Sequence, residues 1–320
     1  AFSWRASNGF HQWFTFARAG GGSGGGGGAA LAGNDGKSAY SAPAGVLMGG
    51  SIQGNALTLQ GTFTHFATLP STYKGFLEGA AGITTDGTNL YVVAGPHGIW
   101  GAPGVVYKVS ISTGAVTELA SIPAPGNITT DGTNVYVQVG GGSIDEISIS
   151  TGAVSALSTD SHYSSGPMTT NGKYLYVRNG SLPSDKIDML STSNGRVSGS
   201  SYNTSAMMPD YITTDGQKLL ILGHNFSNRI ALFKMRFGTH MVAQSDLIID
   251  NISEGPMTCD GKNLFIVSGS GITKVSISTG AASTLSWSGH YATDSFPGIT
   301  TDGKSLFVVD HTANTILRIQ

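Results

Sequence analysis

One short phrase recurs six times along this 320-residue chain. It reads Ile/Met-Thr-Thr/Cys-Asp/Asn-Gly, and an apolar run such as Leu90-Tyr-Val-Val93 follows each copy within a few residues. Its acidic or amide residues lie 45, 40, 44, 45 and 42 residues apart, at Asp86, Asp131, Asn171, Asp215, Asp260 and Asp302. A regular period of short strands and Asp-Gly turns is typical of sheets arranged radially around an axis. The chain is therefore predicted to be all-β.

A complete repeat contains the sequence signals for four strands. Residues 83–85 form a short first strand, and Asp86-Gly87 turns the chain into the second, because glycine adopts the positive φ that such turns need. Residues 105–112 alternate apolar and polar side chains as a third strand does, and a Ser-Thr-Gly turn leads to a fourth strand at 116–119. The repeat unit is thus one four-stranded sheet.

The last repeat is one strand short. Residues 299–319 supply three strands before the chain stops at Gln320, whereas a matching fourth strand, residues 62–69, precedes the first repeat. Pairing of these two segments would leave the last sheet without an open edge. The sequence therefore predicts a six-bladed β-propeller over 56–320, with 56–69 as the closing strand of the last blade, and an aromatic and Gly-rich N-terminal arm over 1–55.

The repeats resemble a known family. The phrase Gly-Ile-Thr-Thr-Asp-Gly-Thr-Asn-Leu-Tyr-Val at 82–92, followed by Ile-Ser-Thr-Gly-Ala-Val at 111–116, is similar to the NHL-repeat propellers of bacterial secreted or surface proteins. The resemblance covers about 56–320, implies a rigid scaffold for binding, and brings no catalytic motif. Only residues 310–318 keep the family's Asp…Asn-Thr-Ile…Arg pattern, so the chain is a divergent relative.

The composition limits the cellular locations and the classes of partner that we expect for this protein. Charged residues make up only 11% of the chain and the net charge is −2, which argues against nucleic acid as a partner. There is no apolar run long enough to span a membrane. The chain opens at Ala1 without a Met, as expected of a mature protein after removal of a signal peptide. We therefore expect a secreted protein, extracellular or on the cell surface.

Two further features bear on modification. Five Asn-X-Ser/Thr sequons are potential attachment sites for an N-linked glycan: Asn127, Asn179, Asn203, Asn225 and Asn251. The single cysteine, Cys259, stands where the other repeats have threonine, so we interpret it as a structural strand residue.

The arm is the part of the chain that the repeat does not explain. Residues 1–19 carry six aromatic side chains, and a tract of glycine broken by one serine follows at 20–28; the aromatics are Phe2, Trp4, Phe10, Trp13, Phe14 and Phe16. Leaving each large ring in water forgoes roughly 1.5–3 kcal/mol, so the segment needs a partner surface. We expect it to dock on another copy of the chain and so build a filament or surface layer. An arm folded back on its own propeller and an engineered linker are the alternatives.

Candidate ligand-binding residues follow from the topology of a blade. Loops between the second and third strands share one face, here called the variable face, with the loops between blades, whereas the Asp-Gly and Ser-Thr-Gly turns share the opposite face. The variable face receives His97, Trp100, His162, Tyr163, His224, His290, Tyr291 and His311. No nucleophile, phosphate-binding or haem motif accompanies them, so no catalytic residue, metal or cofactor is predicted. The alternatives are a metal-dependent hydrolase or lyase, and a carbohydrate-binding adhesin that uses the aromatic residues as stacking platforms.

Overall fold

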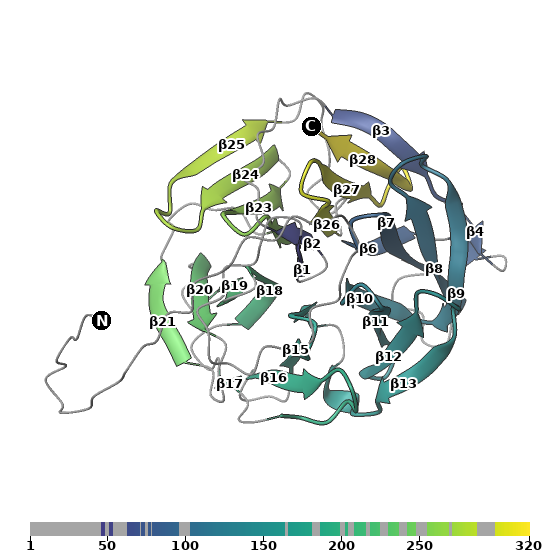
Figure 1. The fold of residues 1–320 in the computed structure, drawn as a ribbon, viewed down its shortest axis with the longest axis horizontal. Coiled ribbons are helices and arrows are strands. Elements are labelled where there is room, and N and C mark those ends of the chain that lie inside the picture. The colour runs from purple at the N-terminus through teal and green to yellow at the C-terminus, as the bar shows by residue number, and fades with distance from the viewer. Residues whose placement is uncertain are drawn as a thin grey trace, which may run out of the picture.

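The protein is an all-β propeller (Figure 1). The computed structural model describes residues 46–48, 51–53, 63–70, 72–73, 76–77, 79–95, 103–163, 166–180, 186–198, 202–203, 208–215, 218–224, 230–236, 242–247, 255–268, 271–286 and 298–320. Six four-stranded antiparallel sheets surround a central axis. In the described part of the chain, the one helical element is a short 3-10 turn, η1 (Ser161–Tyr163).

Five sheets are each built from one continuous stretch of chain. Sheet 1 contains β6 (Gly79–Thr85), β7 (Asn89–Gly95), β8 (Pro103–Ser110) and β9 (Val116–Pro123). Sheet 2 contains β10 (Pro125–Thr130), β11 (Asn134–Val139), β12 (Ser143–Ser148) and β13 (Val154–Ser158). Sheet 3 contains β14 (Met168–Thr170), β15 (Tyr174–Asn179), β16 (Lys186–Ser191) and β17 (Tyr202–Asn203). Sheet 4 contains β18 (Met208–Thr214), β19 (Lys218–His224), β20 (Ile230–Arg236) and β21 (Val242–Leu247). Sheet 5 contains β22 (Met257–Cys259), β23 (Asn263–Ser268), β24 (Gly271–Ser276) and β25 (Ala282–Ser286).

Sheet 6 combines the two ends of the described chain. It contains β26 (Gly298–Thr301), β27 (Leu306–Asp310), β28 (Thr315–Ile319) and, at its outer edge, β3 (Phe63–Thr68). The register pairs Ile319 with Phe63 and Thr315 with Thr68, which is the pairing that the missing fourth strand predicted. Two short hairpins complete the described strands, β1 (Val46–Met48) with β2 (Ser51–Gln53), and β4 (Thr72–Tyr73) with β5 (Phe76–Leu77).

Hydrogen bonds to Asn314 fasten the closing strand at its end. The Asn314 side-chain amide donates to the Pro70 carbonyl at 2.6 Å, and the Leu69 N–H donates to the Asn314 carbonyl at 2.9 Å. Asn314 adopts a left-handed φ of 53°, a conformation that asparagine tolerates better than most residues. The closing strand is therefore held both by its ladder with β28 and by this turn.

The repeated phrase builds one self-contained turn per sheet. In sheet 1, Asp86 Oδ1 accepts from the N–H groups of Thr88 and Asn89 at 2.7 and 2.6 Å, and the Tyr91 hydroxyl donates to Asp86 Oδ2 at 2.6 Å. The second threonine of the phrase, Thr85, accepts from the Gly87 N–H at 2.9 Å. The phrase is therefore a folding device rather than a ligand site.

Cys259 fills the threonine position in sheet 5. It is fully buried, and its Sγ accepts from the Gly261 N–H at 3.1 Å, just as the threonine hydroxyl accepts from the glycine N–H in sheets 1, 2, 3 and 6. Burial raises the pKa of the Cys259 thiol, and a thiol that stays protonated is a poor nucleophile. The structural interpretation of Cys259 fits this geometry.

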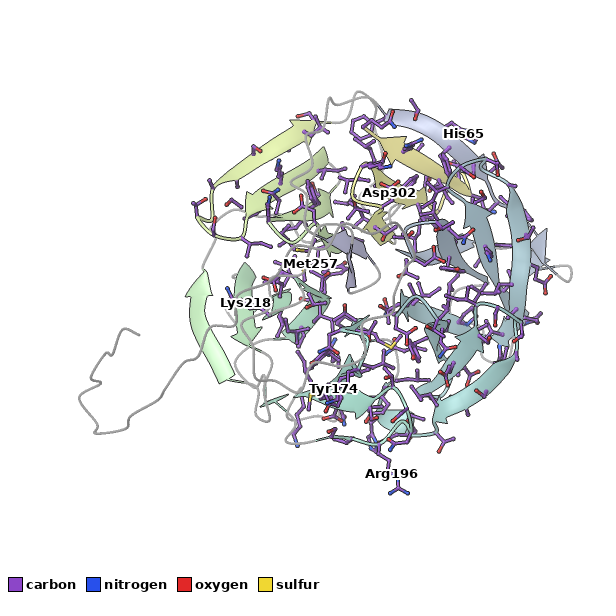
Figure 2. The ribbon with its side chains drawn as sticks, viewed as in Figure 1. His65, Tyr174, Arg196, Lys218, Met257 and Asp302 are labelled. Carbon is purple, nitrogen blue, oxygen red and sulfur yellow. The ribbon has the colours of Figure 1, made fainter. Side chains whose placement is uncertain are left out.

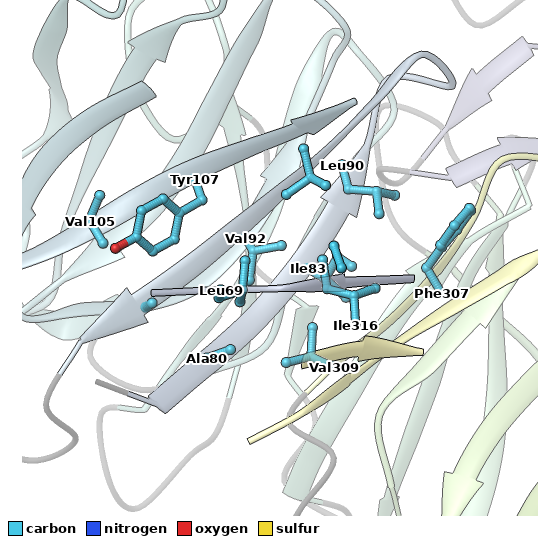
Figure 3. Close-up of a cluster of buried hydrophobic side chains, with 13 residues drawn as sticks. Leu69, Ala80, Ile83, Leu90, Val92, Val105, Tyr107, Phe307, Val309 and Ile316 are labelled. Atoms are coloured by element: carbon cyan, nitrogen blue, oxygen red, sulfur yellow. The ribbon is translucent and has the colours of Figure 1, made fainter. Parts of the chain in front are cut away.

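Apolar side chains fill the spaces between neighbouring sheets. Figure 3 shows the cluster between sheets 6 and 1, where Phe307 and Ile316 pack near Leu90 and Val92. The ring of Phe66, on β3, meets the Phe307 ring edge-on at 5.2 Å between centroids. The closing strand thus contributes to the core as well as to the hydrogen-bond ladder.

Glycines in the turns between the third and fourth strands of sheets 1, 2 and 3 lie close to the backbone of the neighbouring sheet. Gly114, Gly152 and Gly195 adopt φ values of 72°, 71° and 64°. A Cβ on Gly152 would lie 2.5 Å from the Leu119 carbonyl oxygen of sheet 1, and one on Gly195 would overlap the Leu157 carbonyl oxygen of sheet 2. These positions need glycine both for its left-handed backbone and for the close approach.

Removing the closing strand should destabilise the propeller strongly. Deletion of residues 1–69 exposes the edge of β28 and removes the packing of Phe66, Ala67 and Leu69, so we expect it to cost at least about 3 kcal/mol of unfolding free energy. Deletion of residues 1–54 keeps β3 and should cost much less. Chemical denaturation of both truncations is the measurement, and equal stabilities would contradict closure by β3.

The glycine contacts between sheets yield a second prediction. Gly195→Ala should destabilise by more than about 3 kcal/mol, because a left-handed alanine costs about 1–2 kcal/mol and the methyl group also overlaps a backbone carbonyl. Gly172→Ala is the matched control, since Gly172 has a φ of 88° and nothing lies within 4 Å of its Cβ position. Thermal and denaturant unfolding of the two variants should differ, and the same loss in both would refute the close-approach explanation.

Candidate functional site: the axial channel and the variable face

A small cavity lies on the propeller axis. Its volume is about 90 Å³, and it is lined by the starts of the six inner strands, which are β6, β10, β14, β18, β22 and β26. The described lining residues are Gly82, Ile83, Thr84, Asn127, Ile128, Pro167, Met168, Tyr211, Ile212, Thr213, Pro256, Met257, Thr258, Gly298, Ile299 and Thr300. Since a water molecule occupies roughly 30 Å³ in the liquid, this space suits a few waters or a very small ligand.

The lining offers hydrogen bonds but little charge. The described lining residues supply threonine hydroxyls, the side chain of Tyr211, one carboxamide and apolar side chains, and none of them is a carboxylate, Lys, Arg or histidine. Met257 points towards the middle of the ring in Figure 2, whereas Arg196 points away from it at the rim. The cavity can therefore bind a small neutral molecule or water more readily than it can transfer protons.

Asn127 ties two inner strands together at this cavity. Its side-chain amide donates to the Gly166 carbonyl at 2.8 Å and to Gln138 Oε1 at 3.3 Å, and so joins sheet 2 to the start of sheet 3. The amide of a second sequon, Asn179, donates to Asp188 Oδ2 at 2.8 Å. An N-linked glycan uses this same nitrogen, so the hydrogen bonds disfavour a glycan at Asn127 and Asn179.

The β1–β2 hairpin lies at the axis. Strand β2 contacts β6, β22 and β26, which are inner strands of sheets 1, 5 and 6, and Figure 1 shows the hairpin near the middle of the ring. The sequence assigned residues 46–53 to the arm. This section of the arm therefore packs on its own propeller, whereas the aromatic section, with Phe2, Trp4, Phe10, Trp13, Phe14 and Phe16, lies outside the described residues.

The His162-Tyr163 pair sits in η1, between sheets 2 and 3, and its two members have different environments. The His162 side chain is 57% exposed and its Nδ1 contacts Asp160 Oδ1. Tyr163 is 1% exposed and packs against Tyr136 and Met168. Tyr163 is thus a core residue, and its predicted place on a ligand-binding surface was wrong, because the loop folds the ring inwards to fill the space between the sheets.

Sequence reasoning missed the buried carboxylate beneath Tyr163. Asp188 is 3% exposed, and its Oδ2 accepts from the Tyr163 hydroxyl at 3.2 Å and from Asn179. Burial, followed by the charges of Asp188 and Asp160, raises the pKa of the Tyr163 hydroxyl. The register offered a signal: Asp188 pairs with Val177 at the position where Tyr107 pairs with Val92 in sheet 1. An acidic residue at a core position is a feature to look for.

Of the remaining predicted residues, the structure describes His311 and His224, which lie in different sheets. His311 joins sheet 6 to sheet 1, with its Nδ1 3.0 Å from the Ala80 carbonyl oxygen, and His224 ends β19 in sheet 4. His97, Trp100, His290 and Tyr291 lie outside the described residues. Within the described ranges, no group of three or more His, Cys, Asp or Glu side chains could hold a metal ion. Over the same residues, no helix is long and apolar enough to cross a membrane.

Comparison with known proteins supports the fold alone. A protein of unknown function from Bacteroides thetaiotaomicron superposes with a TM-score of 0.55 at 14% identity, covering 80% of this chain and 75% of its own. An auxiliary nutrient binding protein from the same organism also gives a TM-score of 0.55, at 11% identity, with coverages of 81% and 76%. No protein-family model and no curated protein matches the chain, so the resemblance to NHL repeats stays a prediction.

The contrast between the two adjacent residues in η1 is testable. Tyr163→Ala should cost about 3–5 kcal/mol of stability, since it leaves a cavity and removes a donor from Asp188. His162→Ala should change stability by less than about 0.5 kcal/mol, because its side chain is exposed. Denaturant unfolding of both variants measures the difference. A Tyr163→Ala protein as stable as the parent would return Tyr163 to the candidate ligand-binding residues.

Proposed function

We propose that the chain is an extracellular interaction protein, a six-bladed propeller that assembles with further copies of itself through its N-terminal arm into a filament or surface layer. In this proposal, composite sheet 6 counts as the sixth blade. The observation that carries it is the aromatic segment at residues 1–19, whose six large rings need a partner surface.

The chemistry of the axial cavity favours a scaffold over an enzyme. General acid–base catalysis needs a positioned group that titrates near the working pH. The described lining residues include no carboxylate, imidazole, amine or thiol that could take this role. A cavity with this lining supports binding or packing rather than hydrolysis.

The burial of Tyr163 weakens the adhesin alternative. Carbohydrate-binding sites stack sugar rings on exposed aromatic faces, whereas the Tyr163 ring is covered by the core between sheets 2 and 3. The other predicted platforms, Trp100, Trp287 and Tyr291, lie outside the described residues. The aromatic segment at residues 1–19 is therefore the sequence feature that still needs a partner surface.

The arm has the composition of a segment that docks on a partner. Its two tryptophans and four phenylalanines can supply the hydrophobic anchors that dominate protein interfaces. The glycine tract at 20–28 can pass between packed subunits where a side chain would clash. A contact between the arm of one copy and the propeller of the next is heterologous, so it generates rings or open filaments rather than closed two-fold dimers.

Removal of the aromatic anchors tests the proposal. Trp4→Ala with Trp13→Ala should give a folded monomer that no longer assembles, because loss of two anchors costs roughly 4 kcal/mol of docking free energy. Arg5→Ala with Arg18→Ala is the matched control in the same segment, and it should assemble as the parent does. Light scattering and negative-stain electron microscopy report the assembly. Normal filaments from the double tryptophan variant, or a monomeric parent protein, would refute assembly through the arm.

A further inference from the structure

A lysine, an asparagine and an aspartate share one side of the β15–β16 pair in sheet 3. The register places Asn179 directly opposite Lys186, and Asp188 lies two residues beyond Lys186 on the same strand. Because side chains alternate across a strand, all three lie on the same face of the sheet. That face meets sheet 2, since Leu190, the next residue in the alternation, belongs to the core cluster that contains Tyr136.

The three polar residues stand where sheet 1 has core residues. The equivalent register positions of sheet 1 hold Ala94, Val105 and Tyr107, and all three are buried in the core. No other sheet pairs a lysine with an asparagine at these positions. Polar groups buried without partners cost free energy, so their presence together in one sheet needs an explanation other than packing.

Asp188 already holds the Asn179 carboxamide. The Asn179 Nδ2 donates to Asp188 Oδ2 at 2.8 Å, and the Tyr163 hydroxyl donates to the same oxygen at 3.2 Å. Asp188 is 3% exposed, and its Oδ1 accepts no hydrogen bond from the described residues. Among the same residues, no carboxylate forms an ion pair with Lys186. A carboxylate oxygen without a donor and an amine without a counter-ion therefore border one carboxamide.

We propose that Lys186 and Asn179 form an isopeptide bond within sheet 3, with Asp188 as the catalytic residue that moves the protons. Directly opposed residues have their Cβ atoms about 4.5–5.5 Å apart, a gap that the flexible four-carbon stem of lysine can span. The proposal goes beyond self-assembly, because the bond forms between two strands of one chain and needs no second copy.

The reaction balances with these three side chains alone. The Lys186 ammonium gives a proton to Asp188 Oδ1, a transfer that apolar surroundings favour because they disfavour separated charges. The electron pair on Nζ then attacks Asn179 Cγ, and the bond between Cγ and Nδ2 breaks. Nδ2 leaves as an ammonium ion with the two protons that Nζ loses, and Asp188 returns to a carboxylate. No oxidant or cofactor takes part.

Mass spectrometry of the full-length chain tests the bond directly. Protein made in a host without N-glycosylation should weigh about 17 Da less than its sequence, the mass of one ammonia. Trypsin does not cleave after an acylated lysine, so residues 179–196 should appear as one uncut peptide that carries the whole loss. A full-length chain of unreduced mass, or ordinary cleavage after Lys186, would overturn the proposal.

Three variants separate the isopeptide bond from other losses of ammonia. Lys186→Arg keeps the positive charge but removes the nucleophilic amine, and Asp188→Asn keeps the shape but cannot take the proton, so both should have the full mass. Lys173→Arg is the matched control in the same sheet and should stay about 17 Da light.

An unchanged loss in Lys186→Arg would identify a succinimide, for which Asn179-Gly180 is a candidate sequence, and would refute the isopeptide bond. A bond that still forms in Asp188→Asn would refute the catalytic role of Asp188. Lys186→Arg leaves the hydrogen bonds of Asp188 in place, so it tests the bond even if Asp188→Asn does not fold. All of these masses are independent of whether the arm drives assembly.

Discussion

Pairing of β3 with β28 is the interaction on which the rest of the architecture depends. If the last sheet of a propeller does not receive a strand from the other end of the chain, its outer edge stays free and the space beside the first sheet is not filled. Here β3 supplies both the ladder to β28 and the Phe66 ring that packs against Phe307. The same pairing places β3 at the outer edge of sheet 6, whereas β2, which precedes it in the chain, contacts the inner strands β6, β22 and β26.

Two further features stabilise the sheets: the repeated phrase forms the turn within each sheet, and the turn glycines allow close contact between sheets. The Asp-Gly turn satisfies its own backbone donors with one carboxylate and secures that carboxylate with a tyrosine hydroxyl, as Asp131 and Tyr136 show in sheet 2. Burial and the neighbouring Asp131 raise the pKa of the Tyr136 hydroxyl, so it remains a donor. Glycines such as Gly195 let consecutive sheets approach closely. One unit therefore encodes both its own fold and its contact with the preceding unit.

The repeat is strong enough to predict the sheet content, the register of the turns and the composite sheet from sequence. The period sets the sheets, and the missing strand after Ile319 has one counterpart upstream. The candidate site was harder to predict, because the position of a loop on a face does not determine where its side chain points. His162 and Tyr163 are adjacent, yet one is exposed and the other fills the core above Asp188. The seat of the hairpin was also hidden, since residues 46–53 carry no repeat signal and their partner strands are distant in sequence.

The account is that of a ring of sheets in which the described axial lining carries no charge, β3 closes sheet 6 at the rim, and the β1–β2 hairpin contacts the inner strands. Its most direct test is a disulfide between β3 and β28, at the paired positions Thr64 and Arg318. The double variant Thr64→Cys with Arg318→Cys is made in a Cys259→Thr background, where the threonine of the other repeats replaces the single native cysteine. Oxidation should give one cross-linked monomer with altered mobility on a denaturing gel. Cross-linked dimers and higher species would show instead that β3 is exchanged between copies, and would contradict closure within one chain.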